Sequence, residues 1–442
     1  MIRQLKPYPE YKDSGLPWVD RVPSHWQLIP NRGLIRKRKV LVGGKHREYQ
    51  LLSLTKQGVI IRDVTTGKGK FSSDMGTSQE VRNGDLVFCL FDVPETPRTV
   101  GLSCHNGMIT GAYTVFECMD PERAKYFELF YQAMDDRKLL SPLYSGLRNT
   151  IPPLRFIGTK TPQPPPEEQG AIVRFLDHTN VRIERVIRAK RKLTALLNEQ
   201  KQAIIQRAVI CGLDSDAALK PSGIQWLSEI PNHWEKRKLK HIARLKSGEG
   251  ITALQIEATG QYPVFGGGGH RGYTTSYTHD GHFVLIGRQG ALCGNIKYAR
   301  GKFFASEHAV VAMPLADYNV EWFGELLRVM NLNQYSQSAA QPGLSVERIE
   351  NLWIPYPPRV EQDKIVSQFR RETRALDAAL ARSEHEMDLL KEYHMRLVAD
   401  VVTGKLDVRN AAAQLADSAS SGESFIEEEY EHQEHVSSPA CA

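Results

Sequence analysis

Two long segments of the chain repeat apolar residues at alternating spacings of four and three, which is typical of helices that bury one narrow stripe. In the first segment, residues 164–213, prolines precede Glu167 and Glu168, and Gly212 follows the last periodic position. Proline before the first turn, acids within it and glycine after the last turn are helix-boundary signals. The pattern therefore predicts one long helix over this segment.

The second segment, residues 357–410, repeats the pattern and has Gly404 near its end. A narrow apolar stripe is unstable alone in water, so we expect the two helices to pair as an antiparallel coiled coil. The predicted pairing seam consists of Ile172, Leu176, Ile183, Val186, Leu193, Leu197, Ile204, Ile365, Phe369, Leu376, Leu390 and Leu397. An alternative remains open, because a seam does not fix its partner: each helix would be a separate arm that binds another protein.

Short apolar runs led by glycine fill the rest of the chain. "GDLVFCLF" (84–91) and "GHFVLIG" (281–287) have the length of buried strands, and "GAYTVFECM" (111–119) corresponds to "EHAVVAMPL" (307–315). These runs predict two mixed α/β bodies, residues 1–163 and 214–356, that share one framework. The predicted fold class is α+β.

The chain also repeats itself in sequence. "KDSGLPWVDRVPSHW" (12–26) returns as "KPSGIQWLSEIPNHW" (220–234), and "PPPEEQGAIVRFL" (164–176) returns as "PPRVEQDKIVSQF" (357–369). We interpret the order as a tandem duplication that gives the fold a pseudo-two-fold internal repeat. The paired tryptophans favour anchors that hold the start of each body to its core over platforms for stacking bases.

Composition is that of a soluble globular protein, with 41% apolar and 24% charged residues. No apolar run is long enough for a membrane span, and the first residues lack the apolar segment of a secretory signal. The six cysteines form no C-x-x-C pair. We therefore expect a cytoplasmic protein with reduced thiols and without a zinc or redox site.

Charge is uneven along the chain. Residues 411–442 contain seven acidic and no basic residues, and this serine-, alanine- and glutamate-rich segment is predicted to be a disordered acidic tail. The remaining 57 basic and 44 acidic residues give a net charge of +13. A basic body of this kind favours a polyanionic partner, and nucleic acid above others.

Glycine-rich and basic loops between the predicted strands are the candidate contacts to DNA. Glycine lets a backbone approach a phosphate or a base edge, while Arg, Lys and Gln donate hydrogen bonds. The candidate DNA-binding residues are Lys68, Lys70, Arg98, Arg148, His270, Arg271, Arg288, Gln289 and Lys297. As isolated signals, such loops are more often simple turns, and it is their occurrence in two parallel bodies that favours DNA contact.

Several motifs are misleading. The glycines of 267–272 fit G-x-G-x-x-G, but the β-branched and aromatic "YTTSYTH" follows, whereas a dinucleotide fingerprint opens a helix. The sequence contains no P-loop. "HDGH" (279–282) lacks the other ligands of a metal site. Neither "TIPPL" (150–154) nor "IPYPP" (354–358) has the residues of an adenine methyltransferase motif. We find no nuclease cluster, so we expect no catalytic residue, metal or cofactor in this chain.

The ordered motifs resemble a known family. Two half-chains, each with a variable body followed by P-P-x-x-E-Q-x-x-I-V and a long helix, resemble the specificity (S) subunit of type I restriction–modification systems over residues 12 to about 410. "QPGLSVERI" (341–349) and the helix ends "AVICGLD" (208–214) and "VVTGKLD" (401–407) add to the resemblance. The first helix end departs from the family's usual Thr-Lys-Gly form.

The resemblance implies a function. Each body would be a target-recognition domain that reads one half of a bipartite, asymmetric double-stranded DNA target. The helices would set the spacer and dock two methyltransferase (M) subunits, and two restriction (R) subunits would complete the complex. S-adenosylmethionine, ATP and Mg²⁺ would bind to those partners. The alternatives are a self-contained DNA-modifying enzyme with a divergent active site, or a coiled-coil scaffold.

Overall fold

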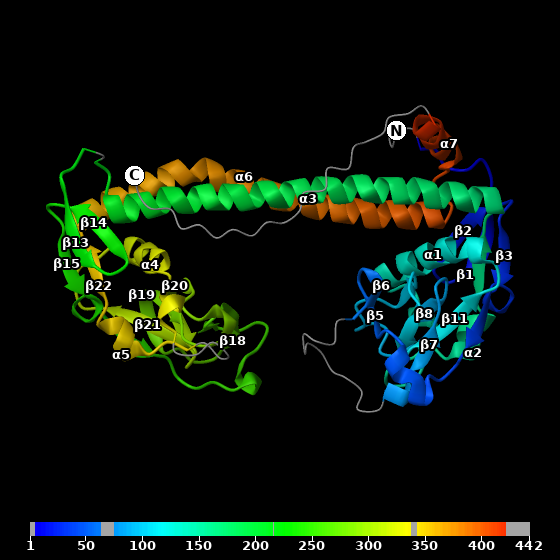
Figure 1. Cartoon of the computed structure of the whole chain (residues 1–442), viewed down its shortest axis with the longest axis horizontal. Coiled ribbons are helices and arrows are strands. Elements are labelled where there is room, and N and C mark those ends of the chain that lie inside the picture. The colour runs from blue at the N-terminus through cyan, green and yellow to red at the C-terminus, as the bar shows by residue number, and fades with distance from the viewer. Residues whose placement is uncertain (1–4, 63–74, 215, 337–342, 421–442) are drawn as a thin grey trace. The chain divides into compact units, whose positions relative to one another are not determined.

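The computed structural model describes residues 5–62, 75–214, 216–336 and 343–420 (Figure 1). Contacts divide the chain into two compact units, residues 1–188 with 387–442 and residues 189–386. Each unit contains one sheet-based body and one half of each long helix. Helices and sheets both occur, which confirms the predicted α+β class.

The first unit is built on a four-stranded sheet in the order β4 (Ile35–Arg38), β11 (Thr114–Cys118), β8 (Leu86–Phe88) and β9 (Val100–Leu102). Four two-stranded pairs surround it: β1 (Tyr11–Leu16) with β2 (Val19–Pro23), β3 (Gln27–Pro30) with β12 (Lys160–Gln163), β5 (Leu52–Thr55) with β6 (Gly58–Ile61), and β7 (Gln79–Val81) with β10 (Gly107–Ile109). Helices α1 (Ala124–Asp136) and α2 (Pro153–Gly158) complete the body. Rings of Phe88, Phe116 and Phe156 meet in its core.

The second unit has a six-stranded sheet in the order β16 (Ala243–Ser247), β21 (Ala309–Pro314), β19 (His279–Gly287), β20 (Ile296–Ala305), β17 (Tyr262–Gly266) and β18 (Gly269–Thr274). The pairs β13 (Leu219–Ile224) with β14 (Leu227–Pro231) and β15 (Glu235–Lys238) with β22 (Trp353–Tyr356) flank it. Helix α4 (Val320–Val329) packs against β19 and β20 (Figure 1), and α5 (Val346–Glu350) precedes β22. The predicted runs correspond to β8, β11, β19 and β21, and β8 pairs with β11 as β19 pairs with β21.

The long helices are α3 (Pro166–Cys211) and α6 (Arg359–Val402). In the second unit, Thr194 Oγ1 lies 3.1 Å from Ser383 Oγ, Lys190 forms an ion pair with Glu386, and Lys201 forms one with Asp377. Partner numbers on α6 fall as those on α3 rise, so these halves run antiparallel. In the first unit, Ile172 and Leu176 share a core with Leu397 and Val401.

The residues of the predicted seam differ in burial, and two in its middle are exposed. Ile172, Leu176, Ile183, Ile365, Phe369 and Leu397 are buried, and Leu197, Ile204, Leu376 and Leu390 are half-buried. Val186 and Leu193, in contrast, are 44% and 47% exposed. Ile187 and Thr194 are half-buried and take their places in the stripe. From Ile183 to Leu197 the spacing therefore runs 4-3-4-3 where the prediction had 3-4-3-4, and the two patterns share Lys190 and Leu197.

The predicted disorder of residues 411–442 is wrong for its first ten residues. Helix α7 (Arg409–Ser420) covers them, and Ala411 and Ala412 are buried in the core of the first unit. Asp407 accepts a hydrogen bond from the backbone N–H of Arg409 at 3.0 Å, as a helix-capping side chain does. Alanine favours helix strongly, and burial against the core adds to that preference. Residues 421–442 lie outside the described residues.

Candidate nucleic-acid interface

The glycine-rich loop of the second unit packs against neighbouring backbone. A Cβ added to Gly267 would lie 3.0 Å from the carbonyl oxygen of His308, and one added to Gly287 would lie 2.6 Å from the carbonyl oxygen of Gly267. Strand β18 begins at Gly269, whereas a dinucleotide fingerprint would open a helix. These glycines therefore serve close backbone packing, and a Rossmann site is excluded.

Residues that are far apart in sequence meet around this loop. The backbone N–H of Arg288 donates to His308 O at 2.9 Å, and Leu344 N–H donates to Arg288 O at 2.9 Å. Gln289 forms an isolated bridge with Gly343. These bonds join the end of β19 to the turn after β20 and to the segment before α5.

The predicted side chains of the second unit therefore belong to one surface. We define the glycine-loop surface as His270, Arg271, Arg288, Gln289, Lys297 and His308. The stem of Lys297 on β20 lies within 3.5 Å of the position a Gly269 Cβ would take. The ring of His270 meets the ring of Tyr273 edge-on, with centroids 4.9 Å apart.

The charges on the glycine-loop surface are available to a ligand. Arg271, Gln289 and Lys297 are exposed, and Arg288 is half-buried. Within the described ranges, no acidic side chain lies in ion-pair range of Arg271, Arg288 or Lys297. His308 is within 3.3 Å of Glu307. Exposed cations and an amide beside closely packed backbone suit phosphate and base-edge contacts.

Arg98, predicted to bind DNA from the first unit, is engaged elsewhere. Its Nη1 lies 2.8 Å from Asp136 Oδ1, and its side chain is only 15% exposed. Burial raises the pKa of the Asp136 carboxyl, and the charge of Arg98 opposes that shift. Arg98 is thus the ion-pair partner of Asp136, the last residue of α1. Lys68 and Lys70 lie outside the described residues.

Arg148 is exposed on a braced turn. Ser145 and Thr150 exchange two backbone hydrogen bonds across it, and Asp92 N–H donates to Arg148 O at 3.0 Å. The turn therefore lies beside the predicted loop 92–98. Its neighbour Leu147 is fully exposed.

The repeated sequence motifs contact each other, which sequence reasoning missed. Trp26 Nε1 donates to Glu168 Oε1 at 2.8 Å, and His25 Nε2 lies 2.8 Å from Glu168 Oε2. Trp234 Nε1 donates to Glu361 Oε1 at 3.0 Å. Both tryptophans are fully buried, as expected of anchors. The sequence carried one signal of this contact, because the motif that ends in tryptophan and the motif that begins each long helix are repeated together.

Over the described ranges, no three His, Cys, Asp or Glu side chains gather closely enough to hold a metal ion. No helix in those ranges combines the length and apolar character of a membrane span.

The unit that holds the glycine-loop surface also matches a known family. Residues 231–380 match the family described as the type I restriction modification DNA specificity domain. Over these residues the chain is similar to that specificity-domain family. This confirms the resemblance that its motifs indicated.

Related proteins carry the same description. The chain is 42% identical over 132 residues to the type I restriction enzyme EcoprrI specificity subunit of Escherichia coli, which covers 29% of this chain and 33% of that protein. It is 23% identical over 287 residues to the type I restriction enzyme MjaVIII specificity subunit of Methanocaldococcus jannaschii, covering 58% of this chain and 64% of that protein. Each match spans less than two thirds of the relative's own length.

A solved structure shares the fold. It comes from a study of complex assembly and conformational transition of the type I R-M system, with a TM-score of 0.54 at 16% identity. The match covers 87% of this chain and 99% of that one.

Proposed function

We propose that this chain is the DNA sequence-recognition subunit of a type I restriction–modification complex and performs no catalysis itself. The observation that carries the proposal is the specificity-domain match over residues 231–380, which includes all the residues of the glycine-loop surface. In this proposal, Arg271, Arg288 and Lys297 contact one half of a double-stranded target. Each side chain that reads a base contributes about 1–3 kcal/mol of discrimination.

The proposal assigns one half-site to each unit, so that the target is bipartite and asymmetric. Support comes from the duplicated order of elements: a hairpin, a sheet with one shared strand pairing, a helix beside it, and then a long helix. The domain boundaries of the proposal are those of the sequence prediction, with target-recognition domains over residues 1–163 and 214–356. Different loop side chains on one framework would give the two halves different base preferences.

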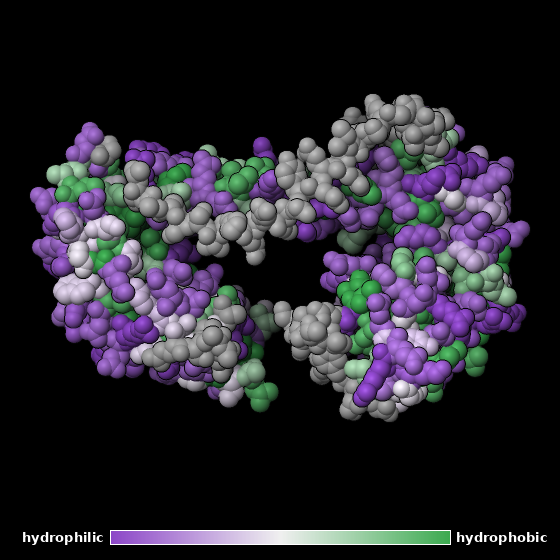
Figure 2. Space-filling model, viewed as in Figure 1, coloured by the Kyte–Doolittle hydropathy of each residue, from purple (hydrophilic) through white to green (hydrophobic). Residues whose placement is uncertain are grey.

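The proposal also gives the long helices two tasks, to set the spacer and to dock two M subunits. Apolar side chains reach the surface along these helices (Figure 2), and Leu193, Leu196 and Leu389 are 47%, 53% and 49% exposed. Exposed apolar positions of this kind suit a protein interface. Two R subunits join the same complex, and the partners bring S-adenosylmethionine, ATP and Mg²⁺. A cytoplasmic location agrees with the free thiols of Cys89, Cys104, Cys118 and Cys293.

Salt dependence of duplex binding tests the proposal. We expect the affinity of the full chain to fall steeply as salt rises. The slope of the logarithm of the binding constant against the logarithm of salt concentration should become shallower by about 0.9 for each phosphate contact removed. A variant with Arg271→Ala, Arg288→Ala and Lys297→Ala should lower that slope. A control with Lys238→Ala, Lys240→Ala and Arg328→Ala removes the same charge elsewhere in the unit and should keep most of it.

The outcomes separate the alternatives. A coiled-coil scaffold predicts no salt-dependent binding to duplex DNA. A self-contained enzyme predicts methylation or cleavage by the chain without partner subunits. Equal slopes for the variant and its control would contradict the assignment of the glycine-loop surface.

A further inference from the structure

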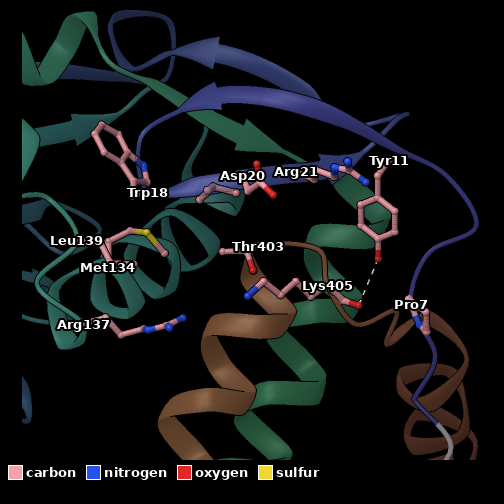
Figure 3. A pocket seen from close by; sticks show the side chains of 11 residues that line it. Pro7, Tyr11, Trp18, Asp20, Arg21, Met134, Arg137, Leu139, Thr403 and Lys405 are labelled. Carbon is pink, nitrogen blue, oxygen red and sulfur yellow. Dashed lines mark hydrogen bonds between the residues drawn. The ribbon is translucent and has the colours of Figure 1, made fainter.

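A cavity of about 530 Å³ lies in the first unit between the β1–β2 hairpin, the end of α1 and the end of α6 (Figure 3). Its volume is that of a pocket for a small molecule. Trp18, Met134 and Leu139 line one side of it. We call it the hairpin cavity, and the proposed recognition of DNA assigns it no role.

Trp18 is the one tryptophan among the described residues that line the hairpin cavity. Its Nε1 atom is buried and has no hydrogen-bond partner among the described residues. In the second unit, the equivalent Trp226 donates its N–H to the carbonyl oxygen of Trp353 at 3.3 Å. The first unit therefore leaves unused a donor that its repeat satisfies.

Three cationic side chains, Arg21, Arg137 and Lys405, line the same cavity. In Figure 3 the Lys405 ammonium and the Arg137 guanidinium point toward one another. Within the described ranges, Arg21 and Arg137 form no ion pair, and Lys405 lies 3.3 Å from Asp400 in an exposed pair. Asp20 is the one acid in the lining. The lining thus has a net positive charge, and an anion between the two facing cations, Arg137 and Lys405, would be stabilised.

The second unit provides an internal comparison, because it keeps the framework without the cations. Glu229 stands at the position of Arg21 in the repeated hairpin. Helices α1 and α4 end alike, each just before a non-glycine residue with positive φ: Lys138 at 50° and Asn331 at 45°. The residue before it is Arg137 in the first unit and Met330 in the second, so Met330 stands at the position of Arg137.

The ends of the long helices α3 and α6 also differ by one cation. Lys405 follows the helix-ending Gly404, whereas Leu213 follows Gly212. Both glycines have positive φ, 75° and 76°. A Cβ added to Gly404 would lie 3.0 Å from the Trp26 ring, and one added to Gly212 would lie 3.1 Å from the Trp234 ring. The duplicated fold therefore forms without any of the three charges, and their gathering in one cavity requires another explanation.

We propose that the hairpin cavity binds a nucleoside monophosphate. The planar base lies against Trp18 beside Met134, and the phosphate lies between Arg137 and Lys405. Asp20 accepts a hydrogen bond from a sugar hydroxyl or an exocyclic amine. The assignment rests on the first unit alone and is independent of the proposed recognition of DNA.

Calorimetric titration of the full chain with adenosine monophosphate tests the assignment, with adenosine and inorganic phosphate as partial ligands. We expect the nucleotide to bind at least about tenfold more tightly than either partial ligand, because it fills both sides of the cavity. The double variant Arg137→Met, Lys405→Leu carries the side chains of the second unit, so its fold should persist. It should weaken nucleotide binding by about tenfold or more.

Two controls complete the experiment. Arg32→Ala removes an exposed cation of the same unit outside the cavity and should leave nucleotide binding unchanged. Trp18→Phe should weaken the binding of nucleotide and of adenosine while leaving that of phosphate unchanged. Failure of adenosine monophosphate to bind at millimolar concentration, equal binding by the double variant, or displacement of the nucleotide by duplex DNA would overturn the assignment.

Discussion

Trp26 donates its indole N–H to the carboxylate of Glu168, with 2.8 Å between Nε1 and Oε1, and so joins the hairpin of the first unit to the first turn of α3. Trp234 and Glu361 make the same bond in the second unit at 3.0 Å. The two duplicated sequence motifs are therefore the two halves of one contact. Each long helix begins at a fixed place on its own body.

Replacing Trp26 by Phe should lower the free energy of unfolding by about 1–3 kcal/mol, because it removes a hydrogen bond to a buried carboxylate. The side chain of Glu168 is 4% exposed, whereas that of Glu361 is 22% exposed. Trp234→Phe is thus a matched control with an expected smaller loss. Urea unfolding measures both, and a larger loss for Trp234→Phe would contradict this account of the contact.

Stability should fall as the pH drops below about 6.5, the ordinary pKa of histidine. Burial lowers the pKa of His394 on α6, while Glu184 and Asp136 partly oppose that shift. The unfolded chain therefore takes up a proton before the folded chain does, and acid favours unfolding. His394→Gln should lose less stability between pH 7 and pH 5, as measured by urea unfolding at each pH. A variant with an unchanged pH profile would show that His394 is not responsible.

Arg288→Ala should relax base preference at one position of a single half-site by about 1–3 kcal/mol and leave the other half-site intact. Arg98→Ala is the informative control, because it leaves Asp136 without its ion-pair partner. We expect it to lower stability and to preserve the recognised sequence. Mapping of methylated sites in cells that express each variant with its methyltransferase subunit checks both expectations.

Lengthening both helices should lengthen the spacer. Lys190 pairs with Glu386, so seven residues inserted after Lys190 and seven inserted before Glu386 keep the antiparallel register. Seven helical residues add roughly 10 Å, or about three base pairs at roughly 3.4 Å each. Insertion in α3 alone is the control that breaks the pairing. An unchanged spacer in the matched variant would contradict the ruler proposal.

Sequence patterns predicted local structure well, because helix boundaries and strands depend on local chemistry. The prolines before Glu167 and the glycine at 212 bracket α3 closely. The prediction for the middle of the stripe failed at Val186 and Leu193, because steps of 3-4 and 4-3 both fit a helical stripe and the adjacent apolar residues Val186 and Ile187 suit either order. Likewise, a basic residue in a loop does not reveal its partner: Arg98 lies against Asp136, an acid from a distant part of the sequence.

The hairpin cavity was beyond sequence reasoning for the same reason. Its cations come from three separate elements, and only the fold brings Arg21, Arg137 and Lys405 together. The glycine-loop surface was partly predictable because its members lie in recognisable loops. Their convergence depends on backbone bonds, such as that between Arg288 and His308, that no local pattern specifies.

The most direct test of the central claim is a map of N6-methyladenine in an unmethylated host that expresses this chain with its neighbouring methyltransferase subunit. A two-headed DNA reader predicts a split motif, with two short specified blocks around unspecified bases. The glycine-loop triple variant should lose one block and keep the other. A short continuous motif would contradict the account, because a single reading head would then suffice.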